Sequence, residues 1–117
     1  MIEFSNDVGE ELAMARFHNG MRPIHPGEIL REEYLVPLDL SIGDLAKELR
    51  IEAAQIDAIV RGDAGVSSEI ALRLARYFGG DAETWLNLQQ AYDLKTVEQQ
   101  VGDTIRAEVA PRNAKAA

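Results

Sequence analysis

Apolar side chains recur every three or four residues in several segments of the chain, which is the spacing of amphipathic helices. The clearest stripe comprises Ile42, Leu45, Ala46 and Leu49. The pattern predicts helices over residues 26–36, 42–49, 52–61, 68–78 and 82–95. No segment shows the convincing two-residue alternation of a β-strand. We therefore expect an all-α protein built around a compact five-helix domain.

Residues that favour helix ends support these boundaries. Pro26 stands where a first helical turn accepts proline, and Pro37 closes the first helix. Ser41 precedes Asp44 at the spacing of a capping box, so it is the expected N-cap of the second helix. Gly79-Gly80 is expected to end the fourth helix, and Asp81 to cap the fifth.

The chain is less regular on both sides of this pattern. Residues 1–20 hold one weak helical stripe that ends at Asn19-Gly20, and Met21 resembles a second start. After Thr96 the apolar stripe fades. We therefore expect an N-terminal leader over residues 1–20 that is either helical or partly disordered, a domain over residues 21–95, and a C-terminal extension and tail over residues 96–117.

The charge balance limits the classes of function. Acidic side chains number 20 and basic side chains 12, for a net charge of −8. This excess argues against a non-specific nucleic-acid binder, although a few cations gathered on one face would still bind DNA. The chain has no cysteine, and its two histidines, His18 and His25, lie in separate segments. We therefore expect no disulfide, metal site or cofactor.

The sequence also lacks the features of membrane proteins, secreted proteins and enzymes. No apolar run approaches the roughly 18 residues needed to cross a bilayer, and the N-terminus lacks the basic region of a signal peptide. The sequence offers no nucleophile with a nearby base and no phosphate-binding loop. We expect a soluble cytoplasmic protein that is not an enzyme and binds no membrane.

The stretch Leu45–Gly62 has the form of a helix-turn-helix. Two short helices meet at Arg50-Ile51, and the second would enter the DNA major groove. That second helix carries Glu52 and Asp57, whose charge opposes the phosphates lining the groove. The motif therefore predicts the fold of a DNA-binding protein with an unusually acidic reading helix.

Three segments in order resemble a known family. They are MRPIHPGEILREEYL at residues 21–35, DLAKEL beginning at Asp44, and ALRLARYFGGDAETWLNLQQAYDL at residues 71–94. Together they are similar to the HigA/VapI-type antitoxins, which belong to the Cro- and lambda-repressor-like (XRE) helix-turn-helix proteins. The resemblance implies a dimeric repressor that binds its own operator DNA. It also implies that the protein neutralises a cognate HigB-like toxin, which cleaves mRNA.

The helix-turn-helix and the family resemblance together indicate which residues would contact DNA. The turn position that the family usually fills with glycine is Arg50, and its usual Ser or Thr helix cap is Glu52. Among the reading residues, Gln55 suits adenine, Ala53 and Ala54 suit a thymine methyl group, and Asp57 suits a cytosine amino group. The expected phosphate contacts are Lys47, Arg50 and Arg61. With so few cations, we expect weak, salt-dependent DNA binding that requires dimerisation.

The fifth helix carries residues for both a core and an interface. We expect Trp85 in the core and a dimer interface formed by Leu88, Ala91, Tyr92 and Leu94. Two other functions fit the same sequence: a stand-alone helix-turn-helix regulator without a toxin, and a protein-interaction module that has lost DNA binding. Glu52, Asp57 and the net charge favour the second of these alternatives.

Overall fold

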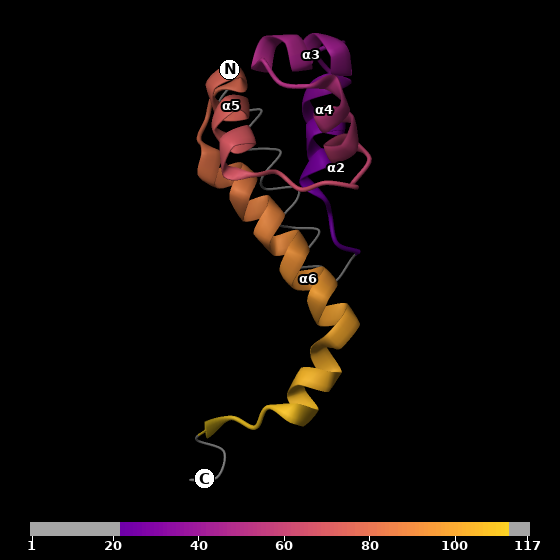
Figure 1. Cartoon of the computed structure of the whole chain (residues 1–117), viewed down its shortest axis with the longest axis vertical. Helices are drawn as coiled ribbons and strands as arrows, with labels where there is room; N and C mark the ends of the chain where they lie inside the picture. The colour runs from indigo at the N-terminus through magenta and orange to yellow at the C-terminus, as the bar shows by residue number, and fades with distance from the viewer. Residues whose placement is uncertain (1–21, 113–117) are drawn as a thin grey trace.

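The computed structural model describes residues 22–112, and their regular structure is entirely helical (Figure 1). The leader predicted over residues 1–20 lies outside this described part. The elements are α2 (Pro26–Leu30), η1 (Arg31–Leu35), α3 (Ile42–Leu49), α4 (Ala53–Val60), α5 (Ser68–Phe78) and α6 (Ala82–Glu108). Because α2 runs directly into the π-helical turn η1, residues 22–112 hold five helical segments. The expected all-α, five-helix fold is confirmed.

Side chains cap the starts of α2, α3 and α6, and two of them, Ser41 and Asp81, are the caps that the sequence predicted. His25 is the N-cap of α2, and its Nδ1 accepts a hydrogen bond from the Gly27 N–H at 2.8 Å. Ser41 Oγ accepts from the Asp44 N–H at 3.0 Å and begins α3. Asp81 Oδ1 accepts from the Thr84 N–H at 3.0 Å, and this bond to the charged form lowers the pKa of Asp81. These interactions satisfy N–H groups that a helix end would otherwise leave unpaired.

The core is built from residues of α2, η1, α3, α4, α5 and the first half of α6. Leu45, Ile56 and Leu74, one each from α3, α4 and α5, have no exposed surface. Trp85 of α6 is 3% exposed, which confirms its predicted place in the core. The Tyr34 ring lies 5.5 Å from the Trp85 ring and 4.6 Å from the Phe78 ring, measured between centroids. Burial of these side chains holds the short helices in one arrangement.

Helix α6 is longer than the sequence pattern predicted. It spans 27 residues to Glu108, so the expected end of the helix near Thr96 was wrong. Its first half packs on α5 and α2, and its second half projects away from the other helices (Figure 1). The described residues are therefore elongated, with extents of 56 × 29 × 22 Å. The boundary predicted at residue 95 falls inside this continuous helix.

No helix within residues 22–112 is both long enough and apolar enough to span a membrane. The same residues contain no group of three or more side chains suited to holding a metal ion.

Candidate nucleic-acid interface

Helices α3 and α4 form the predicted helix-turn-helix. Arg50 links them in the left-handed conformation, with φ 60° and ψ 42°, and the Ile51 N–H reaches back to the Ala46 carbonyl at 3.1 Å. This conformation costs a non-glycine residue about 1–2 kcal/mol, which explains why glycine suits the position. The Arg50 side chain is exposed. The chain thus keeps a tight turn and places a cation there.

Helix α4 turns one face to the core and the opposite face to solvent. Ile56 and Ile59 are 0% and 1% exposed. Ala54 and Arg61 are exposed on the opposite side, with Asp57 half-buried beside them. Half-buried Ala58 also lies on this face. The start of the helix is also acidic, since exposed Glu52 is its N-cap and makes no side-chain capping bond.

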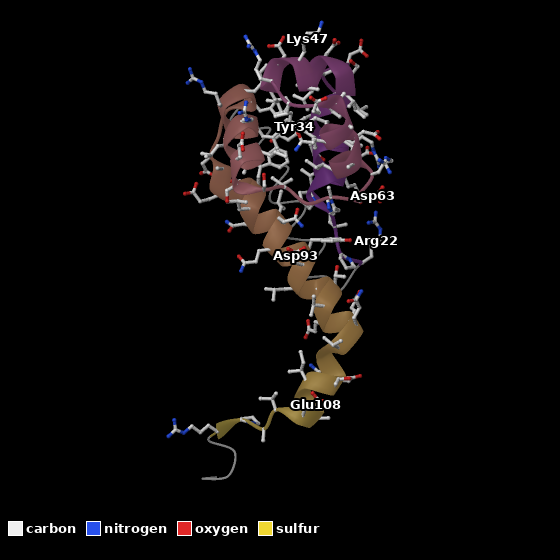
Figure 2. All side chains as sticks on the ribbon, in the orientation of Figure 1. Arg22, Tyr34, Lys47, Asp63, Asp93 and Glu108 are labelled. Atoms are coloured by element: carbon white, nitrogen blue, oxygen red, sulfur yellow. The ribbon has the colours of Figure 1, made fainter. Side chains whose placement is uncertain are left out.

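Four of the predicted DNA-binding residues come together at a shallow groove beside the turn. They are Lys47, Arg50, Ala53 and Gln55. Within residues 22–112, Lys47 and Arg50 are both exposed and neither forms an ion pair. Figure 2 places Lys47 at the α3 end of the molecule, opposite the projecting end of α6. This end of the domain therefore presents two accessible cations beside an exposed amide.

Helix α5 adds two charges to the groove that the sequence analysis did not select. Arg73 Nη1 donates to the Leu49 carbonyl at 2.8 Å, and its Nη2 donates to Glu69 Oε2 at 2.8 Å. The ion pair between Glu69 and Arg73 could be predicted from the sequence, because the two residues are one helical turn apart. The contact of Arg73 with the end of α3 could not be predicted, because Arg73 lies far from the helix-turn-helix in sequence. Arg73 fixes the C-terminus of α3 and leaves the groove with mixed charge.

Arg61, the third predicted phosphate contact, forms ion pairs with two carboxylates. Its Nε donates to Asp57 Oδ2 at 2.8 Å, and its Nη1 donates to Asp63 Oδ2. The hydrogen bond and charge of Asp57, followed by the charge of Asp63, raise the pKa of Arg61. Asp57 and Arg61 therefore lie on the exposed face as predicted, but they contact each other and Asp63.

The loop after α4 is held by residues of α6 and by His25. The Val66 N–H donates to Gln89 Oε1 at 2.8 Å, and the Tyr92 ring lies edge-on to His25 at 4.8 Å. His25 also hydrogen-bonds the Ala64 backbone, and burial lowers the pKa of His25. This arrangement positions the end of α4 relative to α6.

Of the residues predicted to form a dimer interface, Leu88 belongs to the core. Leu88 is 2% exposed and has almost no surface left for a second chain. Ala91 and Tyr92 are half-buried, and Leu94 is 66% exposed. Leu88 and Leu94 are six residues apart and therefore lie on different faces of α6, and the face that carries Leu88 packs into the core.

No protein-family model matches the sequence. Known proteins nevertheless resemble the chain closely. Virulence-associated protein I of Dichelobacter nodosus is 59% identical over 81 residues, covering 69% of this chain and 75% of that protein. The Pseudomonas aeruginosa antitoxin HigA, solved with the higBA promoter, matches with a TM-score of 0.77 and 45% identity over 78% of this chain and 99% of that one.

The chain belongs to the HigA family. A HigA-family addiction-module antidote protein from Coxiella burnetii agrees, with a TM-score of 0.75 and 47% identity over 78% of this chain and 99% of that one. These HigA relatives include antitoxins and a protein solved with promoter DNA, as the resemblance of the three sequence segments implied.

Proposed function

We propose that this protein is an antitoxin that represses its own operon by binding operator DNA as a dimer and neutralises an mRNA-cleaving, HigB-like toxin. The observation that carries the proposal is the match to an antitoxin solved with promoter DNA. This match covers 99% of that antitoxin's chain and 78% of this one. The helix-turn-helix supports it, because Lys47, Arg50 and Gln55 line one accessible groove. The HigA relatives favour a binding protein over an enzyme.

The mechanism follows from the geometry of α3 and α4. The reading helix α4 would insert its N-terminal half into the major groove, where Ala53, Ala54 and Gln55 reach base edges. Lys47 and Arg50 would contact the phosphates beside it and set the orientation. A two-fold dimer would place two such helices about 34 Å apart, on successive turns of the groove.

We propose that the second half of α6 supplies the dimer interface. Leu94, Val97, Val101 and Ile105 form an exposed stripe at spacings of three and four residues, between 39% and 66% exposed. They lie on the part of α6 that projects beyond the other helices (Figure 1). A second copy packed along this stripe would remove its apolar surface from water and pair two reading helices.

Disruption of the stripe should give a monomer. We expect Val101→Asp to raise the dimer dissociation constant by about a hundredfold or more, because burying an unpaired carboxylate opposes packing by several kcal/mol. Analytical ultracentrifugation across a concentration series measures the change. Gln99→Asp, on an exposed and different face of α6, adds the same charge and should leave the dimer intact. Equal dissociation constants for the two variants would contradict this interface.

The repressor function is tested by gel-shift titration on the duplex upstream of the protein's own reading frame. We expect a shift that weakens as salt rises and resists random competitor DNA. Gln55→Ala should weaken the operator complex by about 1–3 kcal/mol if Gln55 makes a bidentate contact to adenine. Asn87→Ala, at an exposed position of α6, is the control and should bind as the wild type does. No shift at low salt would contradict operator binding and favour an interaction module.

A further inference from the structure

The exposed face of α4 ends in a three-residue cluster, Asp57–Arg61–Asp63, which we call the Arg61 clamp. Asp57 lies one turn before Arg61 on α4, and Asp63 lies in the loop that follows. The two carboxylates contact different guanidinium nitrogens, Nε and Nη1. The three side chains together carry a charge of −1 at the position where the motif predicts a phosphate contact.

The backbone holds Asp63 in this position. Gly62 adopts φ 83° and its N–H donates to the Ile59 carbonyl at 3.0 Å, so the chain reverses directly after α4. The Asp63 N–H then donates to the Ala58 carbonyl at 2.8 Å. Farther along, Gln89 of α6 accepts from the Val66 N–H. The backbone thus fixes Asp63 directly after α4, and Figure 2 shows it at the right of the helical domain, below Lys47.

The clamp is exposed enough to open. The side chains of Asp57, Arg61 and Asp63 are 47%, 55% and 60% exposed, and ion pairs in such positions are weak. A phosphate could therefore take Arg61 from a carboxylate, but both carboxylates would remain beside the DNA and repel it. The cluster lowers affinity for any phosphate backbone, whatever the base sequence.

We propose that Asp63, acting with Asp57 on Arg61, is an affinity-setting residue that weakens binding to the phosphate backbone of DNA. This inference rests on the proposed operator binding and extends it. The penalty depends on phosphates alone, so it costs operator and random DNA the same free energy and leaves the ratio of their affinities unchanged. Random DNA offers no base contacts to α4 that offset this cost, so the clamp keeps the protein off random DNA at salt concentrations where the operator still binds.

The test compares Asp63→Asn with Glu108→Gln, which removes the same charge. Figure 2 shows Glu108 near the far end of α6, well away from Asp63. Fluorescence anisotropy is measured on two duplexes of equal length and composition, one from the upstream region and one of random sequence, from low to 0.2 M salt. We expect Asp63→Asn to bind random DNA about five- to tenfold more tightly near 0.1 M salt, with a salt slope steeper by about one for each protomer bound. Operator affinity should rise by a similar factor.

Asp57→Asn gives an independent second test and should also strengthen random binding. Identical random-DNA affinities for Asp63→Asn, Asp57→Asn and Glu108→Gln would overturn the clamp. A gain on the operator duplex alone would also overturn it, because an effect on phosphates acts on both duplexes. The proposed function fails separately, through a wild-type protein that binds its upstream duplex no better than random DNA, while the comparison of variants on random DNA still decides whether the clamp suppresses binding.

Discussion

Replacing Gly27 with alanine is expected to destabilise the domain by about 3 kcal/mol or more, because the backbone of α2 lies directly against the end of α4. A Cβ at Gly27 would lie 1.8 Å from the Ile59 carbonyl oxygen and 2.6 Å from its carbon. Neither atom can move aside as a side chain would, so α2 and α4 must separate. Urea unfolding followed by circular dichroism, at one fixed protein concentration, measures the loss.

Gly43→Ala is the matched control for this prediction. A Cβ at Gly43 meets only Ser41 Oγ, at 3.9 Å, and the residue lies within α3. Alanine is the better helix former, so stability should stay the same or rise by up to about 1 kcal/mol. A Gly27→Ala protein as stable as the Gly43→Ala protein would show that α2 and α4 are not in this contact. The contact matters for function because it fixes the reading helix through its C-terminal end.

Replacing Leu74 with alanine should have a comparably large effect. Leu74 is fully buried on α5, which packs on α3 and α6, so its truncation removes apolar contacts and leaves a cavity. The expected loss is about 2–5 kcal/mol. For a domain of this size, each kcal/mol lowers the melting temperature by about 4–8 °C. Calorimetry at fixed concentration checks both quantities.

Leu72→Ala removes the same atoms two residues away on the same helix. Leu72 is 63% exposed, so its truncation should change stability by less than about 0.5 kcal/mol. Similar losses for the two variants would mean that α5 presents a different face to the core. The pair therefore tests the orientation of α5, which also places Arg73 beside the groove.

Local sequence spacing was a good guide wherever the interacting atoms lie within one helical turn. Ser41 and Asp44, Asp81 and Thr84, and the turn at Arg50 involve residues no more than five positions apart, so their order in the chain nearly determines their geometry. The helix-turn-helix and the exposure of Gln55 follow from the same periodicity. Most of the candidate interface could be predicted for this reason.

The C-terminal end of α6 could not be predicted from local sequence spacing. Past Thr96 the apolar residues continue as a narrow stripe, which is too sparse to mark a core-facing helix. Leu88 lies on a different face of α6 from this stripe, and that face is the one buried in the core. Only the positions of α2 and α5 decide where the core ends along α6.

The sequence by itself thus determined the helices apart from the end of α6, the caps Ser41 and Asp81, the family and the residues that the reading helix displays, because these depend on neighbours in the chain. The tertiary structure alone decided that Leu88 is core, that Arg73 braces the end of α3, and that the loop carrying Asp63 is anchored to α6. Each of these depends on contacts between residues more than twenty positions apart. Such contacts arise from packing of whole helix faces, which a local pattern does not encode.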